Sequence, residues 1–241
     1  MNLLIGILQY NKSAVTAKCI TCIENYTHDI NYSIYLLDNN SSDGSFQEIV
    51  NFCKDKKNIT IEKSETNTGV IGGRNMIFNF FKQQNQFSHI MFIDNDQFVK
   101  EKWAEGYVDL FNLHKKSLCG IEAWILSSNF TPLRKCSLKD SGFSYVGCGG
   151  MMISREAFDE IGSFDDSFNP AYFEDPDYCL RAYDKKIPVL WNKNSKIDHM
   201  PHQTLGQRSL NASMSFRKSL NNFRNKWRGR FGGGILFRNE A

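Results

Sequence analysis

The chain has 241 residues, of which 41% are apolar and 13% aromatic, which is enough for a substantial core and excludes a largely disordered chain. Its 29 basic and 26 acidic residues give a net charge of +3, too balanced for a general nucleic-acid-binding protein. No apolar run approaches the ~20 residues that cross a bilayer, and the short apolar start lacks the basic region of a signal peptide. Seven scattered cysteines, an odd number, suit reduced thiols, so we expect a cytoplasmic protein.

The first hundred residues alternate between short apolar runs and segments whose apolar residues recur at helical spacing. The predicted strands are 2–11, 32–38, 58–64 and 89–99. The predicted helices between them are 14–26, 46–52 and 66–84, the last opening with a glycine-bearing loop. Strands that alternate with helices predict an α/β fold with a mostly parallel central sheet flanked by helices.

The second half is less regular. A glycine-rich turn precedes an apolar strand and a helix within residues 143–162, and a further helix carries Tyr178, Leu180 and Arg181. No internal repeat, low-complexity tract or linker interrupts the chain, so one continuous domain is the simplest interpretation.

Polar residues follow the ends of all four predicted strands of the first half. They are Tyr10 with Asn11, Asp38, the loop 69–75, and the acidic group 94–96. Ligands of parallel α/β sheets bind beyond the carboxyl ends of the strands. The sequence therefore predicts a binding site at this edge of the sheet.

Asp94 and Asp96 flank Asn95 directly after an apolar run. Two carboxylates this close repel each other unless a cation or a set of donors holds them. A hard divalent cation such as Mn²⁺ or Mg²⁺ takes oxygen ligands of this kind and leaves positions for phosphate oxygens. An EF-hand is excluded, because Phe98 stands where a third oxygen ligand is needed. For a motif this short, the alternative is that one aspartate caps a turn and the other is solvated.

Seven motifs occur in the order and spacing of one known family. They are ILQYN, LLDNNSSDGS, NTGVIGGRN, FIDND, GCGGMMISREAFDEIGSFDDSF, YFEDPDYCLRA and KIDHMPH. Each is weak alone, but together they make nearly the whole chain resemble a family-2 glycosyltransferase of the GT-A fold. The resemblance implies a single domain over 1–241, with a nucleotide-binding half at 1–100, a donor-sugar and acceptor half at 101–205, and a basic helical tail at 206–241. It also implies metal-dependent, inverting transfer of one sugar from a nucleotide-diphosphate sugar to a hydroxyl acceptor.

The resemblance implies nucleotide contacts for three residues. Tyr10 would pack on the base and Asp38 would contact base or ribose, against the alternatives of a core tyrosine and an aspartate that caps its loop. Arg74 would supply a planar cation to the nucleotide, against the alternative of a surface salt bridge. Asn75 is interpreted as a structural residue that holds the loop, and the neighbouring glycines would let the backbone approach the ligand.

The same resemblance assigns the acidic motif to donor and metal. Asp94, with Asn95 beside it, would lie on the nucleotide side, and Asp96 would be the direct ligand of Mn²⁺ or Mg²⁺, so that the ion neutralises both carboxylates. His199 matches a family position whose imidazole completes the metal shell. His202 lies close enough in sequence to be confused with it, and a structural, hydrogen-bonded histidine is the alternative.

The motif YFEDPDYCLRA would supply the catalytic carboxylates. Asp175 is the expected general base for the acceptor hydroxyl, and Glu174 would position the acceptor or donor sugar. Asp177 is interpreted as the N-cap of the following helix. Gly149 and Gly150 would run beside the donor sugar, where side chains would obstruct it, with a β-bulge as the alternative.

The resemblance leaves the partners broad. The donor would carry UDP, GDP or dTDP, the acceptor would be a glycan, a lipid-linked molecule or a polypeptide, and no nucleic acid is expected. The basic, aromatic tail from residue 217 could touch an anionic membrane surface, with a packed C-terminal helix as the alternative. Two rival functions stay open. One is a sugar nucleotidyltransferase, although QYNKSAVT lacks the glycine-rich phosphate loop after the first strand; the other is a catalytically silent nucleotide-sugar-binding domain.

Overall fold

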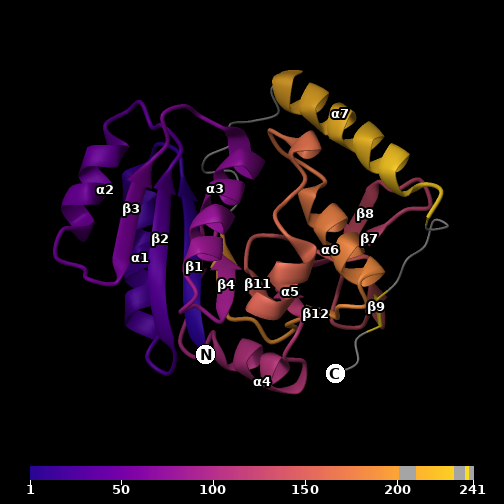
Figure 1. The fold of residues 1–241 in the computed structure, drawn as a ribbon, viewed down its shortest axis with the longest axis horizontal. Helices are drawn as coiled ribbons and strands as arrows, with labels where there is room; N and C mark the ends of the chain where they lie inside the picture. The colour runs from indigo at the N-terminus through magenta and orange to yellow at the C-terminus, as the bar shows by residue number, and fades with distance from the viewer. Residues whose placement is uncertain (201–209, 231–236, 239–241) are drawn as a thin grey trace.

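A computed structural model describes residues 1–200, 210–230 and 237–238. At its centre a seven-stranded sheet has the order β12-β6-β11-β4-β1-β2-β3 (Figure 1). The strands are β1 (Asn2–Gln9), β2 (Asn31–Asp38), β3 (Ile59–Lys63), β4 (His89–Phe92), β6 (Leu118–Gly120), β11 (Met151–Ser154) and β12 (Val189–Trp191). Strands β4, β1, β2 and β3 are parallel neighbours, and so are β12 and β6, whereas β11 runs antiparallel between β4 and β6. The predicted mostly parallel α/β sheet is confirmed.

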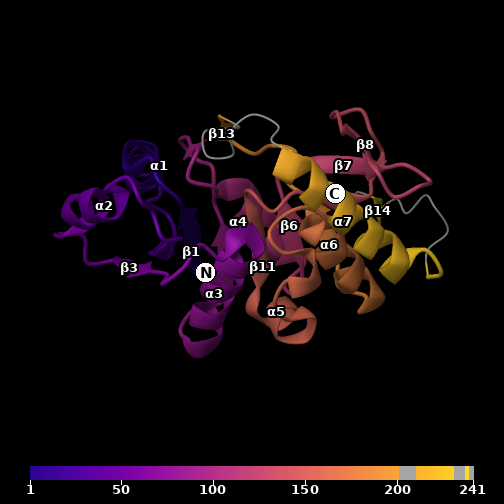
Figure 2. The same cartoon turned by 90° about the horizontal axis from the view of Figure 1, so that it is seen from above.

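Helices cover both faces of this sheet. The helices around the sheet are α1 (Ser13–Tyr26), α2 (Ser45–Cys53), α3 (Gly69–Gln83), α4 (Glu105–Leu113), α5 (Arg155–Ile161) and α6 (Glu174–Asp184), and α7 (Leu210–Trp227) lies outside this layer. Figure 2 shows α1 and α2 on one face and α3 with α5 on the other. Each face has its own core. Ile20 of α1 and Tyr107 of α4 belong to one core, and in the other Phe78 of α3 packs with Phe158 of α5 and Tyr178 of α6. The helical spacing of these apolar residues produces the two layers.

Three small sheets accompany the central one within the described residues. The three-stranded sheet contains β10 (Tyr145–Val146), β7 (Ala123–Leu126) and β8 (Pro132–Lys135). The two pairs are β13 (Ile197–His199) with β5 (Gln97–Val99), and β14 (Phe237–Arg238) with β9 (Gly142–Phe143). In the register of the first pair, His199 lies opposite Gln97. This pairing places His199 next to the acidic motif 94–96, about a hundred residues earlier in the sequence.

The predicted strand 89–99 is wrong in one respect, because it is two strands separated by a turn. Strand β4 ends at Phe92 and β5 begins at Gln97. The Gln97 backbone N–H donates to the Asp94 carbonyl (2.9 Å), and the Gln97 side chain accepts from the Asp94 N–H (3.0 Å). These bonds close the turn that presents the carboxylates. Helix α4 and strand β8 were not predicted.

Helix α7 packs along α6 and the short 3-10 helix Asp166–Phe168 (Figure 1). Phe223 and Trp227 are fully buried, and Lys226 pairs with Asp165 at 2.6 Å. The described part of the tail is therefore the packed helix that the sequence left as an alternative. Membrane contact stays a prediction. Among the described residues, no helix combines the length and apolar character that crossing a bilayer requires.

Candidate functional site

A buried arginine organises the acidic groups at the carboxyl edge of the sheet. Arg74 lies on α3, and its Nη2 is 2.7 Å from Asp94 Oδ1, just beyond β4. Its Nη1 is 3.1 Å from Oε1 of Glu174, the first residue of α6. Arg74 and Glu174 are 7% and 6% exposed. Arg74 thus forms ion pairs that are buried rather than on the surface, and its contact with a nucleotide stays a prediction.

The second aspartate of the motif faces a histidine. His199 Nε2 is 3.4 Å from Asp96 Oδ1, and one ligand atom from each of Asp94, Asp96 and His199 lies within 4.8 Å of the others. The structure thus brings together the three residues that the sequence assigned to a metal site. His202, the alternative histidine, lies outside the described residues.

The chemistry of this cluster suits a divalent cation. Two carboxylates and one imidazole form a mixed oxygen and nitrogen set, which Mn²⁺ accepts readily, and Mg²⁺ prefers the oxygens. Donor atoms that share one ion at about 2.2 Å lie no more than about 4.4 Å apart, so the observed spread needs only small side-chain rotations. The residues therefore fit the implied ion.

His199 is held between two carboxylates. The contact with Asp96 makes the largest contribution, and the contact with Glu122 the next largest, to raising the pKa of His199 to about 10. The same imidazole, followed by Lys135, lowers the pKa of Glu122 to about 2. A metal ion that binds His199 must displace a proton from the imidazole, because only the neutral ring offers a lone pair.

Glu174 and Asp175 begin α6, on the far side of Arg74 from Asp94. Burial, followed by the neighbouring charge of Glu174, raises the pKa of Asp175 well above its usual range. Burial also raises the pKa of Glu174, although Arg74 opposes this shift. Oδ1 of Asp175 and Oε2 of Glu174 are buried without a hydrogen-bond partner in the described structure. A carboxylate with raised proton affinity and a free oxygen can serve as a general base.

Glycines form the backbone wall between these acids. A Cβ at Gly149 would lie 2.5 Å from Asp94 Oδ2, so only glycine lets that carboxylate lie against the backbone. Gly150 has a φ of +83°, a conformation that favours glycine. A Cβ at Gly147 would lie 3.9 Å from both Asp175 Oδ2 and the Cβ of Glu122. The bare backbone of Gly147 therefore lies between Asp175 and Glu122.

The predicted base-contacting residues lie at the ends of β1 and β2. Asp38 is fully buried, and its carboxylate accepts from Gln9 Nε2 (2.9 Å), Ser41 N (2.8 Å) and Ser41 Oγ (2.6 Å). These bonds hold the loop after β2, as its alternative interpretation states. Tyr10 is half-buried at the end of β1. The nucleotide contacts of Tyr10 and Asp38 stay predictions.

Two asparagines contact protein rather than the centre of the site. Asn95 is buried, and its Nδ2 donates to Thr16 Oγ1 of α1 at 3.1 Å. The donor-binding role of Asn95 stays a prediction. Asn75 brackets Phe164, accepting from its N–H at 2.9 Å and donating to its carbonyl at 3.1 Å. The structural role predicted for Asn75 is confirmed.

The glycines of α3 serve packing rather than ligand approach. A Cβ at Gly73 would meet the Leu8 side chain at 2.5 Å, and one at Gly72 would meet Thr68 at 2.8 Å. Gly69 faces Pro170 in the same way, at 2.8 Å. Protein atoms thus occupy the side-chain positions of these glycines, and the expected approach of their backbone to a ligand stays a prediction.

Asp177 does not cap α6. Phe173 occupies the N-cap position and no side chain caps the helix there. The buried Asp177 carboxylate instead accepts from Arg181 Nε (2.9 Å) and Trp227 Nε1 (2.9 Å), and pairs with Lys226 (2.7 Å). The N-cap interpretation is wrong because these donors from α6 and α7 satisfy the carboxylate.

Sequence reasoning missed Glu122 and Gln97. Glu122 is an isolated acidic residue in an otherwise apolar segment, and Gln97 directly follows the acidic motif. The isolated charge of Glu122 could have marked it as a candidate, but its partners Lys135 and His199 lie on segments that are distant in the sequence.

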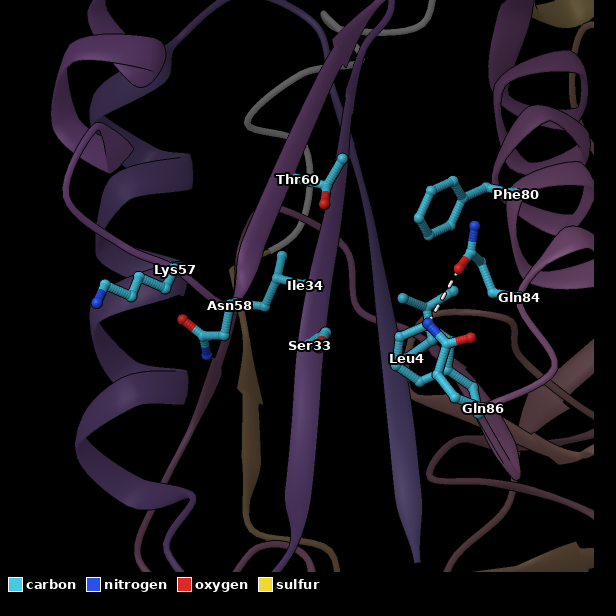
Figure 3. A pocket seen from close by; sticks show the side chains of 10 residues that line it. Leu4, Ser33, Ile34, Lys57, Asn58, Thr60, Phe80, Gln84 and Gln86 are labelled. Atoms are coloured by element: carbon cyan, nitrogen blue, oxygen red, sulfur yellow. Dashed lines mark hydrogen bonds between the residues drawn. The ribbon is translucent and has the colours of Figure 1, made fainter.

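A cavity of about 340 Å³ lies away from this site. Leu4, Ser33 and Thr60 line it from the sheet, and Phe80 and Gln84 line it from the end of α3 (Figure 3). Gln86 Nε2 donates to Gln84 Oε1 at 2.9 Å across its rim. The lining residues of β1 and β2 precede the strand ends that carry Tyr10 and Asp38, so the cavity is separate from the acidic cluster.

Comparison with solved structures defines the class of fold. GalNAc-T7 with UDP, GalNAc and Mn²⁺ matches with a TM-score of 0.71 at 12% identity, over 83% of this chain and 44% of that one. TarS from S. aureus matches at 0.60 and 17% identity, over 80% and 36%. TarS 1-349 with UDP-GlcNAc matches at 0.59 and 17% identity, over 80% and 57%. The chain therefore has the GT-A fold of these glycosyltransferases and spans between a third and three-fifths of their length.

The family follows from the sequence. The model for glycosyl transferase family 2 matches residues 5–162. Because this match covers more than half of the chain, the protein belongs to glycosyl transferase family 2. No curated protein matches it significantly.

Proposed function

We propose that this protein transfers a sugar from a nucleotide-diphosphate sugar to a hydroxyl acceptor, with inversion at the anomeric carbon and with Mn²⁺ or Mg²⁺ as cofactor. The observation that carries the proposal is the convergence of Asp94, Asp96 and His199 within 4.8 Å, across a glycine wall from the buried pair of Glu174 and Asp175. Family membership supports the reaction class.

Asp175 is the general base of the proposed mechanism. Its carboxylate accepts the proton of the acceptor hydroxyl as that oxygen bonds to the anomeric carbon and the nucleoside diphosphate leaves from the opposite face. Burial, followed by the neighbouring charge of Glu174, raises the pKa of Asp175 and so its affinity for that proton. Arg74 holds Glu174 and Asp94 in fixed positions at 3.1 and 2.7 Å.

Asp94, Asp96 and His199 would hold the cofactor. A divalent ion bound there would act as a Lewis acid and stabilise the charge that builds on the departing diphosphate. GalNAc-T7 was solved with UDP and Mn²⁺, and TarS 1-349 was solved with UDP-GlcNAc and with UDP, so we propose a UDP-sugar donor.

Thermal shift measures the donor and the metal together, because a ligand that binds only the folded state raises apparent stability. UDP-GlcNAc, UDP-GalNAc, UDP-glucose, GDP-mannose and dTDP-glucose are each added with and without Mn²⁺. We expect one UDP-sugar to raise the Tm, and to raise it further with Mn²⁺. If no nucleotide sugar stabilises the protein, the proposed activity is rejected.

Two variants assign the effect to the site. Asp96→Ala should lose the increment caused by Mn²⁺, and Asp55→Ala, at an exposed position after α2, should keep it. Proton NMR of the released or transferred sugar reports its anomeric configuration. A product with the configuration of the donor would contradict inversion, and donor binding without turnover would favour a silent binding domain.

A further inference from the structure

Glu122 stands immediately behind the histidine of the metal cluster. Its Oε1 is 3.8 Å from Nδ1 of His199, and Asp96 is 3.4 Å from Nε2 of the same ring. The two ring nitrogens point in different directions, so Glu122 approaches the imidazole from the side away from Asp96. Glu122 is accordingly absent from the set of donor atoms that converge within 4.8 Å.

The glutamate is itself held in place. Its Oε1 accepts from Lys135 Nζ at 2.7 Å, and its backbone carbonyl accepts from Gly147 N–H at 2.8 Å. Lys135 belongs to β8 and Glu122 directly precedes β7, which pair in one sheet. Both the main chain and the side chain of Glu122 are thus positioned before any ligand binds.

We propose that Glu122 is a positioning residue, which accepts the Nδ1–H of His199 and so presents the lone pair of Nε2 to the divalent ion, while Lys135 holds Glu122. This inference rests on the proposed function, since it concerns the same ion. A histidine that binds metal through one nitrogen commonly donates its other N–H to a carboxylate, which fixes the tautomer and ring orientation and makes the ligand more basic.

The separation of 3.8 Å is an ion-pair distance and longer than a hydrogen bond. Both side chains are partly exposed, at 29% for His199 and 23% for Glu122, so neither is locked by packing. A modest rotation of the imidazole toward the metal position closes this contact without moving the backbone, which β13 and β5 hold in register.

The test measures the affinity for Mn²⁺ by isothermal titration calorimetry, with the metal alone and with saturating UDP. Glu122→Gln should weaken Mn²⁺ binding by about 10- to 100-fold, the usual cost of losing such a partner. Glu122→Asp keeps the charge but shortens the reach, and it should also weaken binding. If Glu122→Asp binds Mn²⁺ as tightly as the wild type, charge alone matters and the positioning role is rejected.

A double-mutant cycle separates positioning from a general structural effect. His199→Ala sets the loss caused by removing the imidazole, and adding Glu122→Gln to it should cost no further affinity, because residues that act through one another are not additive. Additive losses would mean that Glu122 acts independently of His199, which overturns the inference. Lys135→Gln should give a smaller loss than Glu122→Gln.

The matched control is Lys100→Gln. Lys100 pairs with Asp198, the neighbour of His199 on β13, at 2.6 Å, and both side chains are more than half exposed. This variant should leave Mn²⁺ affinity unchanged, and thermal unfolding verifies that every variant folds. A wild type that binds no Mn²⁺ would reject both the metal dependence and this inference. If the wild type and Glu122→Gln bind Mn²⁺ with equal affinity, the inference is rejected and the metal dependence stands.

Discussion

Arg74 and Glu174 form a buried ion pair at 3.1 Å although a hundred residues separate them in the sequence. Arg74 also reaches Asp94 at 2.7 Å. One guanidinium therefore ties the start of α6, which carries the proposed base, to the turn that carries the proposed metal ligands. The pair links the two halves of the site mechanically as well as electrostatically.

Arg74→Met should strongly destabilise the protein. The substitution leaves Glu174 buried without its counter-charge, and breaking a buried ion pair in this way costs about 3–5 kcal/mol. Urea unfolding measures the loss.

Two further variants check this assignment. Adding Glu174→Gln to Arg74→Met should recover part of the stability, because the uncompensated charge is then removed. Lys116→Met breaks the pair with Glu160, in which both side chains are more than 40% exposed, and should cost no more than about 1 kcal/mol. Equal losses for Arg74→Met and Lys116→Met would contradict a buried pair.

Asp175→Asn should retain donor binding and lose transfer. The amide fills the same space but cannot accept the acceptor proton, so turnover should fall by about 10² or more. Calorimetric titration with the UDP-sugar and a release assay for UDP measure the two properties separately. Near-normal turnover would remove Asp175 from the mechanism.

The pH dependence of turnover should depend on Glu174. Burial and the charge of Glu174 raise the pKa of Asp175, and a general base must be ionised, so activity should fail on acidification at a higher pH than for an ordinary aspartate. Glu174→Gln removes the like charge, which lowers the pKa of Asp175 and moves the acidic limb of kcat/KM to lower pH. A limb that stays in place, or moves upward, would show that Glu174 does not set this pKa.

His89 should make the protein sensitive to acid. Burial lowers its pKa to about 4, its Nε2 lacks a partner in the described structure, and its ring packs against Phe111 with centroids 4.7 Å apart. The depressed pKa contributes stability above the unfolded value of about 6.5, and this stability is lost as the pH falls toward the folded value. Glu156 opposes the shift and the N-terminal amine adds to it.

His89→Phe keeps the ring and removes the titration. Between about pH 8 and pH 5 the wild type should lose about 2 kcal/mol more stability than the variant. The carboxylates contribute equally in both proteins, so their contribution cancels in the comparison. Urea unfolding at several pH values measures it. Parallel stability curves for the two proteins would show that His89 is not the group responsible.

Much of the site could be predicted because its residues sit in short motifs at strand ends. Asp94 and Asp96 follow β4, and Glu174 and Asp175 open α6, so local sequence placed them at one edge of the sheet. The type of fold was predictable for the same reason, since alternating apolar periods reveal strands and helices locally.

What could not be predicted depends on pairing between distant segments. The role proposed for Glu122 depends on the pairing of β7 with β8 and of β13 with β5, which brings Lys135 and His199 to it. Asp177 was predicted to be a helix cap because the local sequence could not show its donor Trp227, which lies 50 residues away. The break in strand 89–99 also depends on a partner, because β5 leaves the central sheet to pair with β13.

The anchoring of Asp177 by α7 has a consequence for shortened forms of the protein. Asp177 lies two residues after the proposed base, is fully buried, and takes donors from Trp227 and Lys226. A chain that stopped at residue 209 would keep the Arg181 donor but lose both donors from α7, and the first turn of α6 would lose the helix packed on it. Removal of the tail should therefore suppress turnover, although the chain would still contain all the proposed metal ligands and the proposed base.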